Sequence, residues 1–443
     1  MNALTPVRSV CVASVLLLAV ALTFFAASAR AAWTSPVTLS AAGRNANSAQ
    51  VAIDAQGDAV FVWRRFDGTS WRIQTRARSA SGTLGPVQNL SPAGQDAKLP
   101  QVGVDSDGDA VFAWRNEDGP CCRIQSRARS AAGALGPVQT LSTGAGAATL
   151  PQVGMDGDGD AVFVWQRSDG TYWRVQIRTR SATGTLGQIQ TISATGHALM
   201  PQVAVNPVGR AVFTWQRFPR IETRTRTAAG ALSQVQTLSP PPAEGRHPSS
   251  PQVGVDAQGN AVFVWNLFES AFPRGATRVQ ARARTAAGAL SPIQNLVWPP
   301  LGGGGCGCSP QVAVDPTGDA VFSWEYRPNY LDSSGVQVRA RSAAGSLSPI
   351  QNLTAAAGHG TGSDAQVGID ADGDAVVAWQ FGTETESGVA AQVRSAAGTL
   401  GPLQTFPSSG FLPHVAVNGA GDAALTWQES NGTNFVIKAS AGP

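Results

Sequence analysis

The sequence predicts an all-β protein built from repeated units, and three features of the 443-residue chain carry this prediction. Aligning the chain with itself gives eight copies of one unit of about 50 residues, a period typical of repeat architectures. Each copy contains short apolar runs bounded by Asp or Asn and Gly, as in strands joined by tight turns. Only 14% of the residues are charged and 49 are Gly, which excludes a coiled coil or a disordered chain.

A tryptophan recurs once in every unit. Successive copies are separated by 51, 51, 50, 50, 59, 55 and 48 residues. A position that is apolar in every copy belongs to the core. We therefore expect this column to pack between units rather than to stack on a carbohydrate. Its members are Trp63, Trp114, Trp165, Trp215, Trp265, Trp324, Trp379 and Trp427.

Each unit predicts four strands, named here a to d. In the second unit they are Gln101–Asp105, Asp109–Trp114, Arg123–Arg129 and Pro137–Ser142. Strand b is apolar at successive positions because neighbouring units cover both of its faces. Four-stranded units of this kind are the blades of a propeller. The sequence therefore predicts a single eight-bladed β-propeller, with a seven-bladed ring and one displaced unit as the alternative.

The two ends of the repeat region complete each other. The eighth unit stops after its strand c, Asn434–Lys438, whereas Ser35–Ser40 is a strand d without a unit of its own. Pairing these segments removes two exposed sheet edges. We therefore predict that the N-terminal strand closes the ring.

Loop lengths separate a constant face from a variable face. From the first residue of strand a to the tryptophan is 13 residues in all eight copies, whereas the stretch from the tryptophan to the last basic residue of strand c varies from 11 to 19. The a-to-b and c-to-d turns emerge on the constant face, and the b-to-c and d-to-a loops emerge on the variable face. Recognition is commonly found in such individual loops on a rigid frame.

The first 31 residues read as a secretory signal peptide. Arg8 precedes the apolar stretch Val10–Ala27, and Ala29-Arg30-Ala31 is an A-x-A cleavage site. We expect residues 1–31 to be removed and residues 32–443 to form the propeller, secreted to the extracellular or periplasmic space. No membrane span is expected in this mature chain. Without Arg8 and Arg30, 32 minus 2 leaves 30 basic against 29 acidic residues, so nucleic acid is not an expected partner.

A short pattern carries a family resemblance. P-x-V-A-V-D-x-x-G-x-A-V, at Pro201–Val212, Pro310–Val321 and Pro413–Ala424, resembles the NHL-type repeat of β-propellers, and the whole unit is similar to those of uncharacterised secreted bacterial propellers. The resemblance implies a fold but no activity. S-D-G-T-Y-W at Ser168–Trp173 resembles the Asp-box of sialidase-like propellers, although that box lies between strands c and d and this segment lies between b and c.

The turns of the constant face offer two kinds of candidate charge site. Three of them read D-x-D-G-D, starting at Asp105, Asp156 and Asp370, and could hold calcium, which needs six to eight oxygens. Five sister turns keep the same length without the middle acid, so we expect hairpins that need no metal or other cofactor. The Asp that begins strand b is expected to lie across from the Arg that ends strand c, which predicts a ring of opposite-charge pairs.

Four cysteines follow the signal peptide, namely Cys121, Cys122, Cys306 and Cys308. An even number in an exported chain indicates disulfides. We expect bridges within each pair rather than across the ring. A four-thiolate metal site is the alternative, although neither C-C nor C-x-C is the usual spacing for zinc.

The longest insertions indicate where a ligand would bind. They are Leu267–Gly275, Val297–Ser309 and Tyr326–Ser334, in blades five and six. Aromatic side chains near arginines suit a glycan or protein surface. The predicted ligand-binding residues are Phe268, Phe272, Trp298, Tyr326 and Tyr330.

These observations favour a monomeric, secreted, non-catalytic scaffold that binds an extracellular glycan or protein. The alternative is a propeller hydrolase or lyase acting on extracellular polysaccharide. No nucleophile elbow or phosphate-binding loop is present, and no catalytic residue is predicted. Acidic residues that could converge at the mouth of the ring in such an enzyme are Glu117, Asp118, Asp169, Glu222 and Glu325.

Overall fold

The computed structural model describes residues 32–118, 121–240, 244–270, 274–299, 303–356, 360–383 and 385–442. The predicted signal peptide lies outside these residues. Ala32–Pro443 is one compact unit. The described residues form 32 strands and one short helix, α1 (Leu353–Ala356). No helix among them is long and apolar enough to cross a membrane.

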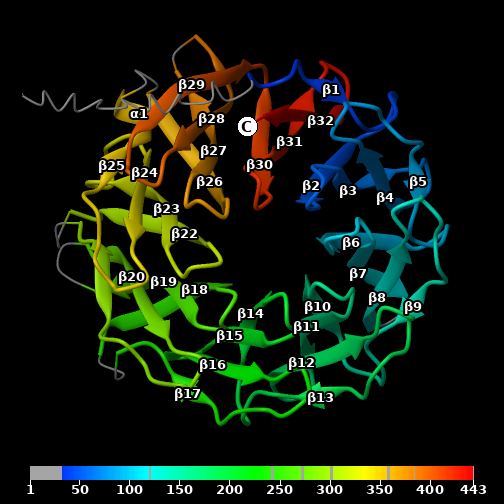
Figure 1. Ribbon diagram of the computed structural model, residues 1–443, viewed down its shortest axis with the longest axis horizontal. Helices are drawn as coiled ribbons and strands as arrows, with labels where there is room; N and C mark the ends of the chain where they lie inside the picture. The colour runs from blue at the N-terminus through cyan, green and yellow to red at the C-terminus, as the bar shows by residue number, and fades with distance from the viewer. Residues whose placement is uncertain are drawn as a thin grey trace, which may run out of the picture. The chain divides into compact units, whose positions relative to one another are not determined.

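The strands form consecutive antiparallel groups of four, arranged around a central opening with strand a innermost (Figure 1). The groups are numbered here as blades in chain order. In the order a to d, blade 1 comprises β2 (Ala46–Ile53), β3 (Ala59–Phe66), β4 (Trp71–Arg78) and β5 (Gln88–Asn89), and blade 2 comprises β6 (Asp96–Val104), β7 (Ala110–Asp118), β8 (Cys121–Arg129) and β9 (Gln139–Thr140). Blade 3 comprises β10 (Ala148–Met155), β11 (Ala161–Ser168), β12 (Trp173–Arg180) and β13 (Gln190–Thr191). Blade 4 comprises β14 (Leu199–Val205), β15 (Ala211–Arg217), β16 (Arg220–Arg226) and β17 (Gln236–Thr237).

The remaining blades follow the same order. Blade 5 comprises β18 (Arg246–Val255), β19 (Ala261–Glu269), β20 (Ala276–Arg284) and β21 (Gln294–Val297), and blade 6 comprises β22 (Cys306–Val314), β23 (Ala320–Arg327), β24 (Gly335–Arg341) and β25 (Gln351–Asn352). Blade 7 comprises β26 (Thr361–Ile369), β27 (Ala375–Gly382), β28 (Ser387–Arg394) and β29 (Leu400–Pro407). Blade 8 comprises β30 (Gly410–Val417), β31 (Ala423–Ser430), β32 (Phe435–Gly442) and β1 (Val37–Thr38).

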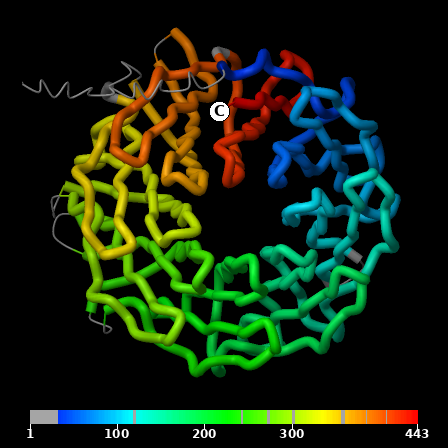
Figure 2. Tube along the Cα trace, in the orientation of Figure 1, coloured from blue at the N-terminus to red at the C-terminus, as the bar shows by residue number. Residues whose placement is uncertain are grey.

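Blades 5 and 6 are joined into one eight-stranded sheet. A single parallel pair, Thr277 with Cys306, connects β20 to β22, and the two blades otherwise keep the pairing of their sisters. The prediction of an eight-bladed propeller is therefore confirmed. The path of the chain passes once around the opening, from blue to red (Figure 2).

The N-terminal strand closes the ring, as predicted. In β1, Val37 pairs with Ala439 and Thr38 pairs with Lys438 of β32. Beyond the strand, the N–H of Leu39 donates to the carbonyl of Ile437 over 2.8 Å. The eighth blade is thus built from both ends of the described chain, which lie side by side in Figure 1.

The core consists of eight hydrophobic clusters, each shared by two adjacent blades. Between blades 1 and 2, for example, Phe112 and Trp114 pack against Val60, Ile73 and Leu90. All eight repeated tryptophans are fully buried. The tryptophan column is therefore core, as predicted, and is not available to stack on a sugar.

Every strand a contains a bulge that the repeat pattern did not predict. In β6 the register shifts between Lys98 and Gln101, and Leu99 has a φ of 55°. Six of the eight bulged residues precede a proline, which lacks an N–H and is tolerated in strands at bulges and edges. The residues with positive φ are Ser48, Leu99, Leu150, Met200, Ser250, Ser309, Asp364 and Leu412.

The turns of the constant face are Asx-type hairpins, as their sequences predict. Asp105 accepts the N–H groups of Asp107 and Asp109 over 3.0 and 2.9 Å. Asp109 in turn accepts the N–H of Ala131 in the c-to-d turn over 2.8 Å. Arg129 is in register with Ala110, so the predicted Asp–Arg pairing across strands b and c is wrong.

Candidate functional site

Three aromatic rings stack in series on the variable face of blades 4 and 5. His247 of β18 is the cross-strand partner of Phe268 of β19, and their ring centroids are 6.1 Å apart with nearly parallel planes. Phe218, in the loop between β15 and β16, also stacks on His247, with ring centroids 5.3 Å apart. All three side chains are exposed, and Phe218 is 60% exposed. A loop of blade 4 and two strands of blade 5 therefore build one aromatic ladder.

Two further exposed rings belong to blades 5 and 6, and each contacts an arginine. The guanidinium of Arg278 lies 3.3 Å from the ring centroid of Trp298, and that of Arg274 lies 3.4 Å from the ring centroid of Tyr330. Such cation–π contacts hold both partners in place. Trp298 is 56% exposed and Tyr330 is 47% exposed. Both rings are therefore fixed and accessible.

Buried Glu269 connects the ladder to these rings. It follows Phe268, forms an ion pair with Arg246 at 2.9 Å and also pairs with Arg278. Burial lowers the pKa of Arg278, and the Glu269 charge opposes this shift. The aromatic–arginine surface is defined here by the side chains of Phe218, Arg246, His247, Phe268, Arg274, Arg278, Trp298 and Tyr330.

Glycines allow this surface to be compact. A Cβ at Gly275 would lie 2.5 Å from Cζ of Phe268, so the ring lies directly over the Gly275 backbone. A Cβ at Gly304 would lie 3.0 Å from Cβ of Tyr330, and Gly304 has a φ of 70°. The N–H of Tyr330 donates to the carbonyl of Gly303 over 3.0 Å. The Gly-rich insertion thus supports Tyr330.

The predicted ligand-binding residues do not all lie at one surface. Phe268, Trp298 and Tyr330 belong to the aromatic–arginine surface. Tyr326 is half-buried and packs against the cluster between blades 5 and 6. Phe272 lies outside the described residues. The sequence did not identify Phe218 and His247 as members, because no spacing along the chain shows that aromatic rings of two blades stack.

The cysteines differ in state. Cys306 and Cys308 form a disulfide at the start of β22, with their Cα atoms 5.5 Å apart. Cys122 is a free thiol whose Sγ accepts from Arg115 over 2.8 Å. The side chain of Cys121 lies outside the described part of the chain. The disulfide constrains the insertion that also supports Tyr330.

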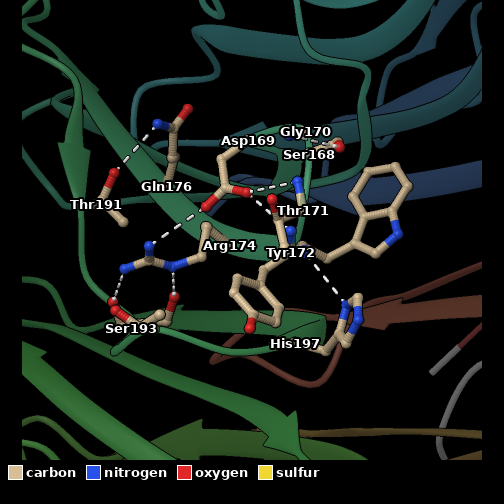
Figure 3. A network of polar contacts seen from close by, with 12 residues as sticks. Ser168, Asp169, Gly170, Thr171, Tyr172, Arg174, Gln176, Thr191, Ser193 and His197 are labelled. Atoms are coloured by element: carbon tan, nitrogen blue, oxygen red, sulfur yellow. Dashed lines mark hydrogen bonds and ion pairs between the residues drawn. The ribbon is translucent and has the colours of Figure 1, made fainter.

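The Asp-box-like segment of blade 3 is a hairpin held by hydrogen bonds to the Asp169 side chain (Figure 3). Asp169 accepts the N–H groups of Thr171 and Tyr172 over 3.0 and 2.8 Å, and these bonds lower its pKa. Arg174 connects Asp169 to the carbonyl of Ser193 in the next loop. The rings of Tyr172 and His197 meet edge to face at 5.4 Å. These contacts organise the loop itself.

The acids that an enzyme could have used have structural partners. Glu222 is buried and accepts from Trp215 Nε1 over 3.0 Å and from Arg217 over 3.3 Å. Glu325 accepts the N–H of the bulged Asp364 over 2.8 Å, and burial raises its pKa. Gln166, at the equivalent place in blade 3, accepts from the bulged Met200 in the same way.

Of two other acids in this group, Glu117 has ion-pair partners, and the side chain of Asp118 is outside the described part of the structure. Glu117 accepts from Lys98 and Arg115 over 3.0 and 3.1 Å. The side chain of Asp118 is not among those described. Glu117, Glu222 and Glu325 therefore each have a hydrogen-bond or ion-pair partner within the fold.

Comparison with known proteins gives the fold and no more. No described family and no curated protein matches the sequence. The WD40 domain of SCAP from fission yeast is 9% identical over 92% of this chain and 98% of its own, with a TM-score of 0.54. This likeness supports the β-propeller fold alone.

Two other solved structures are similar at lower TM-scores. A protein of unknown function from Dyadobacter fermentans is 12% identical over 92% of this chain and 98% of its own, with a TM-score of 0.45. An ulvan lyase of polysaccharide lyase family PL25 is 8% identical over 76% of this chain and 90% of its own, with a TM-score of 0.49.

Proposed function

We propose that this protein is a secreted, monomeric, non-catalytic scaffold that binds an extracellular glycan through the aromatic–arginine surface. The observation that carries the proposal is the serial stack of Phe218, His247 and Phe268, exposed beside the arginine-supported rings of Trp298 and Tyr330. Residues 1–31 serve as its signal peptide, and NHL-like blades form its scaffold.

The chemistry of the surface suits a carbohydrate chain. Aromatic side chains present large, rigid apolar faces at low entropic cost, against which the C–H faces of sugar rings pack. Arginine supplies up to five N–H donors, which hydroxyl or carboxylate oxygens accept. Two aromatic platforms at one surface can contact successive sugars of an extended chain, because both are already fixed by the fold.

The test is binding of the purified protein to an array of cellulose, chitin, pectin, alginate and dextran. We expect at least one polysaccharide to bind, and Phe218→Ala with Trp298→Ala to weaken this binding at least tenfold. The thermal midpoint should change little, because both side chains are largely exposed.

Tyr172→Ala in blade 3 is the matched control, because Tyr172 is also an exposed ring on the variable face, at 36%. It should leave binding unchanged. Failure to bind any polysaccharide, or loss of binding in the Tyr172 variant alone, would contradict the proposal. In the first case, a protein ligand would take the place of the glycan.

A further inference from the structure

The constant face carries clefts between adjacent blades. Three described cavities occupy equivalent places, between blades 1 and 2, blades 3 and 4, and blades 5 and 6, with volumes of about 240, 240 and 400 Å³. Each is lined by residues of the a-to-b and c-to-d turns. They lie on the face opposite the aromatic–arginine surface, because those turns emerge on the constant face.

The charges that line these equivalent cavities differ. The cavity between blades 1 and 2 is lined by Asp54, Asp58, Asp107 and Arg129. The cavity between blades 3 and 4 is lined by Asp156, Asp160, Arg180 and Arg226. The cavity between blades 5 and 6 is lined by Asp256, Arg284 and Arg341. Among the described lining residues, only the third cavity has more arginines than aspartates.

One substitution in the repeat removes an acid from this third cavity. Asn260 stands where Asp58 and Asp160 line the other two. Its side-chain oxygen accepts the N–H of Ala286 over 2.8 Å, as the aspartates do in their own blades. The turn therefore keeps its shape while the cavity loses a negative charge.

The remaining acid of the cavity, Asp256, already accepts hydrogen bonds within the a-to-b turn. Asp256 is buried and accepts from the backbone N–H and from Nδ2 of Asn260, over 2.7 and 2.6 Å. The neighbouring Asp319 acts on Arg341 through its charge, while its own carboxylate accepts the N–H of Ala343 over 2.7 Å. Neither acid forms an ion pair with Arg284 or Arg341 among the described contacts.

Both arginines are nine-tenths buried and bond only to neutral acceptors among the described residues. Arg284 is 5% exposed and Arg341 is 6% exposed. Their Nε atoms donate to Gln236 and Gln294 over 2.6 and 2.9 Å. Their Nη1 atoms donate to the carbonyls of Thr285 and Ser342, each over 3.2 Å. Buried charges without a partner are costly, so the site favours an anion.

A further cation, from blade 4, acts on Arg284 of the cavity. Arg210 replaces the aspartate of its sister blades, and its Nη1 donates to the carbonyl of Ala286 over 2.8 Å. Burial lowers the pKa of Arg284, and the charge of Arg210 lowers it further. Arg210 thus lies between blades 4 and 5 and adds positive potential at Arg284.

The rest of the lining is largely apolar. Val262, Leu290 and Val314 line the cavity together with several alanines. A cavity of about 400 Å³ is within the range of small-molecule sites. We propose that the cavity between blades 5 and 6 binds a small organic acid, with its carboxylate at Arg284 and Arg341 and its apolar body against Val262, Leu290 and Val314. Charge-assisted bonds from arginine to carboxylate are among the strongest in proteins.

The test uses benzoate as the probe and neutral benzamide as its isostere, in calorimetric titrations of the whole protein. Benzoate should bind saturably and benzamide at least tenfold more weakly. Asn260→Asp should weaken benzoate binding at least tenfold, because it restores the acid of the sister cavities. This variant should fold, because six blades carry Asp at that position.

Asp58→Asn, the converse change between blades 1 and 2, is the control and should leave the affinity of the original site unchanged. Equal binding of benzoate and benzamide, no binding of either, or unchanged benzoate affinity in Asn260→Asp would each overturn the proposal. The outcome does not bear on glycan binding, because the two sites lie on opposite faces.

Discussion

His414 is the one exception to a glutamine that begins the predicted strand a in the other seven units. Its Nδ1 is buried without a hydrogen-bond partner among the described residues. Burial lowers the pKa of the imidazole to about 4 from its usual 6.5. The folded protein therefore holds His414 neutral at pH values where the unfolded chain would protonate it.

We expect this histidine to destabilise the fold in mild acid. The folded pKa is depressed, so stability is lost as the pH falls from about 6.5 towards about 4, by roughly 2 to 3 kcal/mol. His414→Gln should remove this part of the pH dependence, because glutamine does not titrate. Urea unfolding of both proteins at pH 7 and pH 4.5 measures it. An unchanged difference between the two pH values would contradict the assignment.

At this scale the sequence predicted which residues repeat but not all of their contacts. The Asp of strand b and the Arg of strand c were expected to pair because the strands are antiparallel. Asp109 instead precedes β7 and caps the c-to-d turn, and Arg129 reaches Gln88 of the preceding blade over 3.0 Å. The pairing fails because the strand register places Ala110, one residue after Asp109, across from Arg129, and because Arg129 bonds to the preceding blade. Neither the register nor this contact can be read from the repeat.

Among the elements, the a-to-b turn of blade 2 is sterically constrained by the preceding blade. Gly108 has a φ of 88°, and a Cβ there would lie 2.8 Å from Oδ2 of Asp54 in the preceding blade. The Asp54 carboxylate cannot move aside freely, because its Oδ1 accepts the N–H groups of Gln56 and Asp58. The turn therefore fits against the preceding blade as well as reversing the chain.

Gly108→Ala should destabilise the protein by about 2 to 3 kcal/mol, from the left-handed backbone and the clash together. Gly94→Ala isolates the backbone part, because Gly94 has a φ of 80° and nothing within 4 Å of its Cβ position. That variant should cost about 1 kcal/mol. Chemical denaturation compares the two. Equal losses would show that the contact with Asp54 is not a constraint.

The strands and turns were predictable because they depend on local patterns, whereas the bulges were missed. Proline after Leu99, Leu150 and Met200 was the available signal, since proline within a strand indicates a bulge or an edge. The aromatic ladder had no such signal. Phe218 and Phe268 come from different blades, and only the packing of those blades brings both rings against His247.

For the whole molecule, the strongest prediction concerns closure. Deleting residues 32–40 removes β1, exposes the edge of β32 and removes the fully buried side chain of Leu39. The thermal midpoint should fall by at least about 2 °C, because burial of one such side chain alone contributes about 1.5 to 3 kcal/mol and about 1 kcal/mol shifts the midpoint of a chain of this length by about 1 to 2 °C. A synthetic peptide of residues 32–42 should restore it. A truncated protein that melts like the intact one would show that β1 does not hold the ring.

The number of blades and the joining strand followed from counting units, because the eighth unit lacks a strand d and Ser35–Ser40 supplies one. The fold was therefore more accessible from the sequence than the site. Val37 and Ala439 lie about 400 positions apart in the chain but pair directly. That contact could be inferred from the sequence only because two units are incomplete. The sequence contains no comparable signal for the stacking of the rings on the variable face.

The shared eighth blade also orders events during synthesis. Each of the first seven blades is contiguous in the chain, so it can form as soon as its own residues are available. β1 is made first, yet its partner β32 is made last, and until then the first strand has no place in a sheet. Loop-closure entropy grows only slowly with chain length, so this late step costs little once the other blades have stacked. The earliest strand of the propeller is therefore the last to find its partner, and its pairing marks the completion of the ring.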